Sequence, residues 1–161
     1  MSGLNRSLVL GRGAFVALSL LVISGCGDDI IAPDLGNGID GSVTMQIDGT
    51  SWTATFATAS NQGGIVGIGA GDTQGVGFGF AFVGTTTGTY SVGPTLANNA
   101  TYSEGSLAWS AVNTQGSGTI SVTTLTADRV AGTFTFEVEA VGTHTPATKS
   151  LTSGTFDIPL S

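Results

Sequence analysis

The sequence predicts an all-β domain, an antiparallel meander that forms a small β-barrel or β-sandwich. Apolar and polar residues alternate with a period of two along most of the chain after Ser42, which is typical of half-buried strands. No segment in that part sustains the 3.6-residue period of an amphipathic helix. Clusters of Gly, Pro, Asn and Ser recur at intervals of roughly 8 to 12 residues, which predicts about eight to ten short strands. Barrel and sandwich share this alternation, and the local hairpins slightly favour a barrel.

The first strands follow from residues 42–82. Apolar side chains alternate along 43–47, Asp48-Gly49 is a two-residue hairpin turn, and the next strand is expected to place Trp52, Ala54 and Phe56 on one face. Residues 65–70 form a short run interrupted by glycine. Residues 76–82 then place four bulky groups on one face and leave the other nearly bare: Val76, Phe78, Phe80 and Phe82.

The second half of the chain repeats the same pattern. Residues 133–140 give the clearest strand, with Phe134, Phe136, Val138 and Ala140 inward, and a last strand over 155–158 ends at Pro159, which has no ladder donor. Between residues 82 and 133, the residues expected to face inward are Tyr90, Val92, Leu107, Trp109, Ala111, Ile120 and Val122.

The N-terminus carries an export signal. Arg6 and Arg12 precede the almost wholly apolar run 14–23, which is too short to span a bilayer and therefore predicts a secretory h-region. The run closes in Ile-Ser-Gly-Cys at 23–26, and this tetrad resembles the lipobox of bacterial lipoproteins. We expect a signal peptide over 1–25, cleavage between Gly25 and Cys26, an acidic Gly-rich tether over 26–41 and one all-β domain over 42–161.

Cys26 is the only cysteine in the 161 residues. The lipobox resemblance implies acyl chains such as palmitate on Cys26, so the expected partner is a membrane and the expected location is the cell envelope. Because Gly27 rather than Asp follows the cysteine, we expect the outer membrane. A lipid-modified thiol leaves no cysteine for disulfides, metal ligation or nucleophilic catalysis.

The charge balance excludes nucleic acid as an expected partner. After Cys26 the chain keeps two basic residues, Arg129 and Lys149, against eleven acids. Phosphate binding depends on Lys and Arg that release counterions, and two are too few. The acids are scattered or lie in the tether, so they favour solubility.

Three short motifs resemble one known group of proteins. They are Asp48-Gly49-x-x-Trp52-x-Ala54, Gly132-Thr133-Phe134-x-Phe136 and Thr152-x-Gly154-x-Phe156. They are similar to small lipoprotein domains of unknown function that are frequent in Bacteroidetes and related bacteria, and the resemblance covers roughly 41–160. It implies an all-β exported lipoprotein and no catalytic residues. The chain departs from that group in lacking a lysine-rich start after the cysteine.

The reactive residues of the sequence predict a protein that is not an enzyme and that has no cofactor or metal site. His144 is the only histidine and lies in a loop, where we expect a solvated side chain. Glu137 and Glu139 lie two apart on one strand face and are interpreted as solvating charges that block edge pairing rather than paired catalytic carboxylates. No serine-hydrolase elbow or calcium loop is present in the sequence.

The remaining candidates for ligand contact are four aromatic residues: Trp52, Tyr90, Tyr102 and Trp109. They could stack on a sugar or line the mouth of a cavity, and core packing is the alternative interpretation. We also expect the bare glycine face at 75–79 to be compensated by barrel bending or by Trp52 or Trp109 lying over it. The sequence thus predicts a non-catalytic structural or interaction role, with unknown envelope protein partners, and a calycin-like carrier of a small apolar ligand as the alternative.

Overall fold

The computed structural model describes residues 41–112 and 114–161, and within them the chain forms strands, turns and loops without a helix. The predicted signal peptide, Cys26 and nearly all of the tether lie outside the described residues. The described residues form eleven strands, slightly more than predicted: β1 (Ser42–Ile47), β2 (Thr50–Thr53), β3 (Phe56–Gln62), β4 (Ile65–Gly71), β5 (Val76–Val83), β6 (Gly88–Val92), β7 (Asn99–Glu104), β8 (Leu107–Ala111), β9 (Ser117–Leu125), β10 (Arg129–Ala140) and β11 (Thr148–Pro159).

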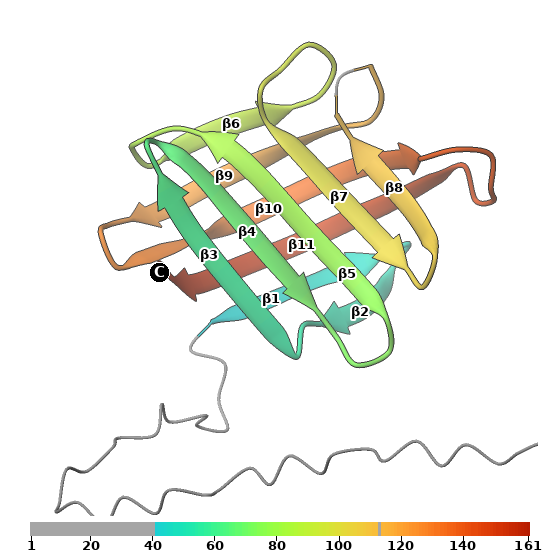
Figure 1. Cartoon of the computed structure of the whole chain (residues 1–161), viewed down its shortest axis with the longest axis horizontal. Coiled ribbons are helices and arrows are strands. Elements are labelled where there is room, and N and C mark those ends of the chain that lie inside the picture. The colour runs from blue at the N-terminus through green and yellow to red at the C-terminus, as the bar shows by residue number, and fades with distance from the viewer. Residues whose placement is uncertain (1–40, 113) are drawn as a thin grey trace, which may run out of the picture. The chain divides into compact units, whose positions relative to one another are not determined.

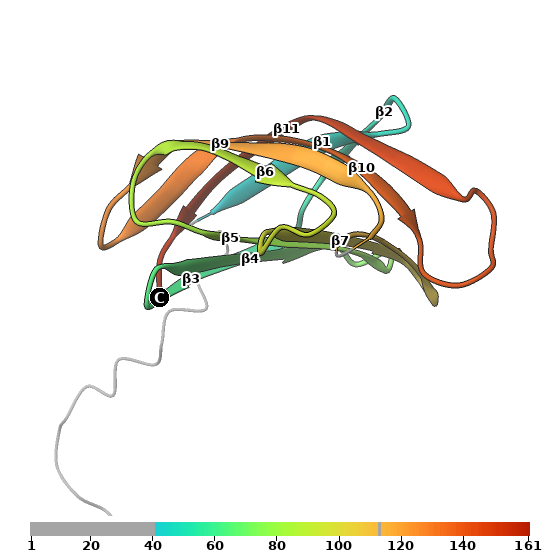
Figure 2. The same ribbon diagram turned by 90° about the horizontal axis from the view of Figure 1, so that it is seen from above.

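The strands form one antiparallel sheet that curls into a half-barrel, which confirms the predicted fold class. Figure 1 shows β3, β4, β5, β7 and β8 crossing in front of the other strands, and the turned view of Figure 2 shows two facing layers. The sheet passes from one layer to the other where the end of β10 pairs with β8, at Glu139–Ser110 and Ala140–Trp109. The order is not a simple meander, because β9 pairs with both β6 and β10, and β1 pairs with β11.

The edge strand β3 comes close to the C-terminal end of the chain. A single parallel bridge joins Ala59 of β3 to Leu160, and the Ser161 amide donates to the Ala59 carbonyl at 3.2 Å. Figure 1 accordingly places the C-terminus beside β3. One bridge is a weaker connection than a ladder, so the molecule stops short of a complete barrel.

Phenylalanine rings fill the space between the two layers. Phe78 and Phe80 of β5 meet Phe134 of β10 with ring centroids 4.8 and 5.4 Å away, and Phe80 lies 5.3 Å from Phe156 of β11. All of these rings are at most 5% exposed. The predicted inward faces of 76–82, 133–140 and 155–158 are therefore confirmed, although Val76 and Ala140 are only partly buried.

Three phenylalanine rings of the core each lie opposite a glycine on the neighbouring strand. Phe136 lies opposite Gly118, Phe134 opposite Gly154, and Phe156 opposite Gly132. A Cβ on Gly118 or Gly154 would collide with the ring opposite, and on Gly132 it would lie 2.8 Å from Phe156 and collide with the Ser121 carbonyl. We call these the glycine–phenylalanine pairs. Each ring covers backbone that a side chain would otherwise occupy.

Two inward assignments from the sequence are wrong. Phe56 is 54% exposed, because β2 ends at Thr53 and the chain bends at Ala54-Thr55 before β3, so the alternation does not continue through the bend. Leu107 is 38% exposed at the first position of β8. A period-two pattern assumes an unbroken strand and cannot detect a bend between layers.

We predict that Gly154→Ala destabilises the domain by about 1–3 kcal/mol, because its methyl group must displace the Phe134 ring. The matched control is Gly69→Ala on β4, where the added Cβ would lie 3.5 Å from Thr58 Oγ1 in ordinary contact. That change should be neutral or slightly stabilising. Urea unfolding gives the free energy of unfolding of both variants. Equal values would contradict the close contact between Gly154 and the Phe134 ring.

Candidate functional site

The four aromatic residues singled out in the sequence do not form one site. Trp109 and Tyr102 are fully buried and pack together with ring centroids 5.6 Å apart. Tyr90 packs on Phe82 instead, at 4.6 Å, and its hydroxyl donates to the Thr86 carbonyl. Core packing is thus the observed role of Trp109 and Tyr102. Trp52 is half-buried and lines a surface pocket.

Trp52 is held in place by a carboxylate. Its indole Nε1 donates to Asp72 Oδ2 at 2.6 Å, and Asp72 Oδ1 accepts the amide of Gln74 in the β4–β5 turn and that of Val76 at the start of β5. The hydrogen bond from Trp52, followed by that from Val76, lowers the pKa of Asp72 below its ordinary value. Asp72 therefore remains ionised and ties β2 to the turn before β5.

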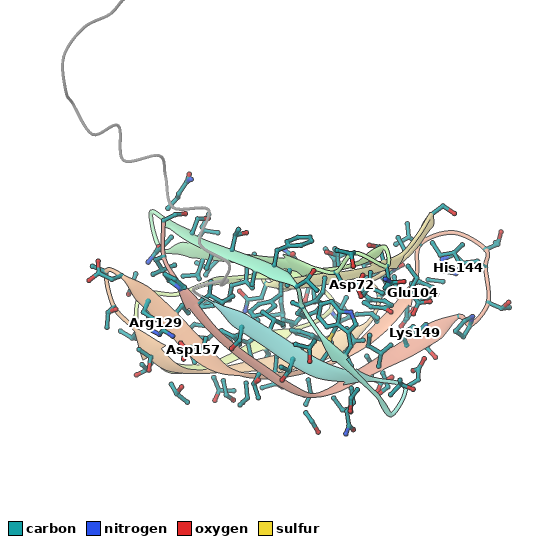
Figure 3. All side chains as sticks on the ribbon, turned by 90° about the horizontal axis from the view of Figure 1, so that it is seen from below. Asp72, Glu104, Arg129, His144, Lys149 and Asp157 are labelled. Carbon is teal, nitrogen blue, oxygen red and sulfur yellow. The ribbon has the colours of Figure 1, made fainter. Side chains whose placement is uncertain are left out.

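The main charged group of the domain is centred on Lys149 of β11. Its Nζ donates to Glu104 Oε1 at 2.9 Å and lies 3.4 Å from Asp48 Oδ2. The same ammonium lies over the rings of Tyr102 and Trp109, at 5.8 and 5.3 Å from their centroids. We call these five residues the lysine cluster. Figure 3 shows Lys149, Glu104 and Asp72 at one end of the domain, opposite the Arg129–Asp157 pair.

The lysine cluster is assembled from distant parts of the chain. Asp48 lies in the β1–β2 turn predicted from Asp48-Gly49, where both residues have positive φ, at 49° and 83°. That turn is held to β11 because Asp48 Oδ1 accepts the Ser150 amide at 2.9 Å. Glu104 ends β7, and Tyr102 of the same strand donates its hydroxyl to Glu104 Oε1. The cluster therefore connects both layers at the end of the core.

The pKa shifts keep Glu104, Lys149 and Tyr102 in their ordinary charge states. Burial opposes ionisation of Glu104, but the hydrogen bonds from Tyr102 and Lys149 outweigh it and lower its pKa. Burial likewise opposes the charge on Lys149, and its bonds to Glu104 and Asp48 outweigh this and raise its pKa. Burial and the bond to Glu104 raise the pKa of the Tyr102 phenol.

These directions define how the cluster responds to pH. Since the folded pKa of Glu104 is lowered, its contribution to stability is present above the ordinary pKa of 4.5 and is lost as pH falls through the folded value. The raised pKa of Lys149 gives stability that is present below 10.5 and is lost as pH rises through the folded value. The cluster is consequently at full strength throughout the neutral range.

A pocket of about 310 Å³ opens beside the lysine cluster. Carboxylate, ammonium, hydroxyl and aromatic groups all face it, and its lining residues are Ile47, Asp48, Thr50, Ser51, Trp52, Val76, Tyr102, Glu104 and Lys149. Glu104 and Asp48 are 39% and 46% exposed there, whereas the Lys149 side chain is only 11% exposed. We call it the lysine pocket. The sequence pointed to Trp52 and Tyr102 but missed the charged residues.

His144 is not the solvated side chain that the sequence predicted. It is half-buried, its Nε2 hydrogen bonds to the Ala108 carbonyl at 2.8 Å, and its ring meets Trp109 edge-on at 4.5 Å. Its Nδ1 is buried with no hydrogen-bond partner in the described part of the chain. Because Trp109 Nε1 also donates to the Pro146 carbonyl, the β10–β11 loop packs on Trp109.

Of the two expectations for the glycine face at 75–79, the covering tryptophan is wrong. Neither Trp52 nor Trp109 lies within contact distance of a Cβ built on Gly75, Gly77 or Gly79. A Cβ on Gly77 would meet only Ser103 Oγ, at 2.7 Å, whereas one on Gly79 would lie 3.0 Å from the Ile68 carbonyl. The backbone of β4, rather than a tryptophan, approaches Gly79.

Glu137 and Glu139 face outward as predicted, and both are hydrogen bonded. Ser150 Oγ donates to Glu137 at 2.5 Å, and the Gly116 amide donates to Glu139 at 3.0 Å. Their strand is paired on both sides, so these carboxylates do not protect a sheet edge. Between residues 41 and 161, leaving out residue 113, no three His, Cys, Asp or Glu residues gather closely enough to hold a metal ion.

We predict that Lys149→Met lowers the free energy of unfolding by about 1–3 kcal/mol, because it leaves partly buried Glu104 without its ammonium partner. The matched control is Arg129→Met, which removes the exposed Arg129–Asp157 pair and should cost at most about 1 kcal/mol. Chemical denaturation at neutral pH tests both. A Lys149→Met variant as stable as its parent would contradict the assigned role.

Comparison with known proteins gives one family. No curated protein and no solved structure matches the chain. The part of the chain that the structure describes contains no helix long and apolar enough to cross a membrane. A family model, described as a domain of unknown function (DUF6252), matches residues 40–158 and so includes every strand from β1 to β10 and nearly all of β11. The expectation of an uncharacterised domain family is confirmed, and the chain belongs to the DUF6252 family.

Proposed function

We propose that this chain is a lipid-anchored protein of the bacterial envelope whose β-domain acts by binding rather than by catalysis. The observation that carries the proposal is the sequence at 14–26, an apolar run that closes in Ile-Ser-Gly-Cys. Small residues at Ser24 and Gly25 give a peptidase access to the backbone, and Cys26 supplies the thiol for acylation. The tether after Cys26 then leads to the first strand at Ser42.

The lysine cluster supports a binding role over catalysis. Catalytic acids and bases require pKa values shifted toward the working pH. Here the shifts run the other way, since Glu104 is held ionised, Lys149 is held protonated and the Tyr102 phenol keeps its proton. Such groups keep one protonation state, so each can serve a ligand as a constant hydrogen-bond donor or acceptor. They are poorly suited to proton transfer.

The alternative of an apolar-ligand carrier receives no support from the core. A carrier needs an internal cavity of a few hundred Å³. The space between the layers is occupied by phenylalanines that contact one another, with Phe78 and Phe134 stacked at 4.8 Å. The lysine pocket opens at the surface, and charged groups as well as apolar side chains line it.

We predict that Cys26→Ser abolishes incorporation of a palmitate analogue in growing bacterial cells, because the hydroxyl of serine cannot replace the thiol that receives the lipid. Ser24→Ala is the matched control, since alanine keeps a small residue before the cleavage point and should preserve labelling. The parent protein should fractionate with the outer membrane. Label retained on the Cys26→Ser variant would refute the anchor, and fractionation with the inner membrane would refute the location alone.

A further inference from the structure

The lysine pocket offers hydrogen-bonding groups of both polarities within one small space. Lys149 Nζ and the Tyr102 hydroxyl both donate to Glu104 Oε1, so they leave Glu104 Oε2 without a hydrogen bond in the described structure. Glu104 and Asp48 remain substantially exposed as acceptors. The hydroxyls of Thr50 and Ser51 lie at the exposed rim. A ligand entering the pocket therefore meets donors and acceptors side by side.

The charges of the lysine pocket disfavour ionic ligands of either sign. An anion would face Glu104 and Asp48, both acidic. A cation would face an ammonium that already lies between these two carboxylates, and Lys149 cannot move away because its side chain is almost buried over Tyr102 and Trp109. A neutral ligand with several hydroxyl groups can donate to the carboxylates and accept from the ammonium.

The remaining walls of the pocket are apolar or aromatic. Trp52 is half-buried on one side, and Ile47 and Val76 also line the space. The hydrogen bond to Asp72 holds the indole of Trp52 in position before any ligand arrives. An aromatic wall with a few oriented polar groups suits a ligand that has both a C–H face and hydroxyl edges. A pyranose ring has this combination.

We propose that the lysine pocket binds a neutral sugar residue of an oligosaccharide, with Trp52 against the ring and Glu104, Asp48 and Lys149 hydrogen bonded to its hydroxyls. The pocket volume of about 310 Å³ admits one such residue, while the open rim at Thr50 and Ser51 allows the oligosaccharide to continue outward. The proposal names a ligand class for the binding role proposed above. It does not depend on the lipid anchor.

The test is calorimetric titration of the lipidated protein in a detergent that has no sugar head group. The probes are the neutral trisaccharides maltotriose, cellotriose and mannotriose, the anionic trigalacturonate and the cationic glucosamine trimer. We expect at least one neutral trisaccharide to bind at millimolar concentrations or below, and the two charged probes to bind at least about tenfold more weakly.

Two substitutions on β2 locate the binding. Thr50→Trp places a large side chain at the rim of the pocket and should weaken binding by at least about tenfold. Thr53→Trp adds the same side chain at an exposed position on the same strand outside the pocket lining, and should leave binding unchanged. Glu104→Gln keeps the shape, removes the carboxylate and should also weaken binding. Far-ultraviolet circular dichroism confirms that each variant is folded.

The proposal is overturned if no neutral trisaccharide binds, if the glucosamine trimer or trigalacturonate binds as tightly as the best of them or more tightly, or if Thr50→Trp and Thr53→Trp bind alike. A folded Glu104→Gln variant with the parent's affinity also overturns the assigned role of the carboxylate. Loss of sugar binding leaves the anchor unaffected, and loss of labelling at Cys26 leaves the pocket unaffected, so the two proposals fail separately.

Discussion

The glycine–phenylalanine pairs are the constraint on which the rest of the domain depends. A phenyl ring that lies over the neighbouring strand needs bare backbone beneath it, and Gly118, Gly132 and Gly154 provide that backbone opposite Phe136, Phe156 and Phe134. Because the side-chain period of a strand is two, a shift of one residue in register would turn each ring to the outer face. The pairs therefore set the alignment of β9, β10 and β11 together.

That alignment determines the aromatic core, and one of the same strands carries Lys149 of the lysine cluster. With the rings of β10 and β11 inward, they meet Phe78 and Phe80 of β5 and bring the two layers together. The register of β10 and β11 shifts between Phe134 and Phe136, and beyond that shift Lys149 of β11 lies at the end of the core, opposite Val138 of β10. There the ammonium covers Trp109 and Tyr102 and reaches Glu104. The polar end of the domain thus adjoins its aromatic centre.

The sequence motifs acquire a physical meaning from these contacts. The spacing Gly132-Thr133-Phe134 and Gly154-Thr155-Phe156 gives each strand one glycine and one ring two residues apart, on the same face. Each glycine receives the ring of the other strand. The motif Asp48-Gly49-x-x-Trp52 similarly combines the turn that carries Asp48 with the indole held by Asp72. These contacts explain why such short motifs accompany this fold.

Local periodicity predicted most of the strands because alternation along one strand reports which face is buried. It succeeded for 133–140, where polar and apolar residues alternate throughout, and the Asp48-Gly49 residue pair correctly predicted the β1–β2 turn. It failed at Phe56, which follows a bend, and at His144, whose partners Ala108 and Trp109 are on β8. No local pattern links Lys149 to Glu104 or Asp48, which lie far away in sequence, so the charged part of the pocket required the three-dimensional structure.

The most direct test of the glycine–phenylalanine pairing is a double-mutant cycle between Gly154→Ala and Phe134→Leu, measured by urea unfolding. If the Phe134 ring occupies the space of the missing Cβ, the smaller leucine should relieve the collision. The double variant should then be more stable than the sum of the single changes predicts, by about 1 kcal/mol or more. Additivity within about 0.5 kcal/mol would contradict the pairing as the constraint that sets the register.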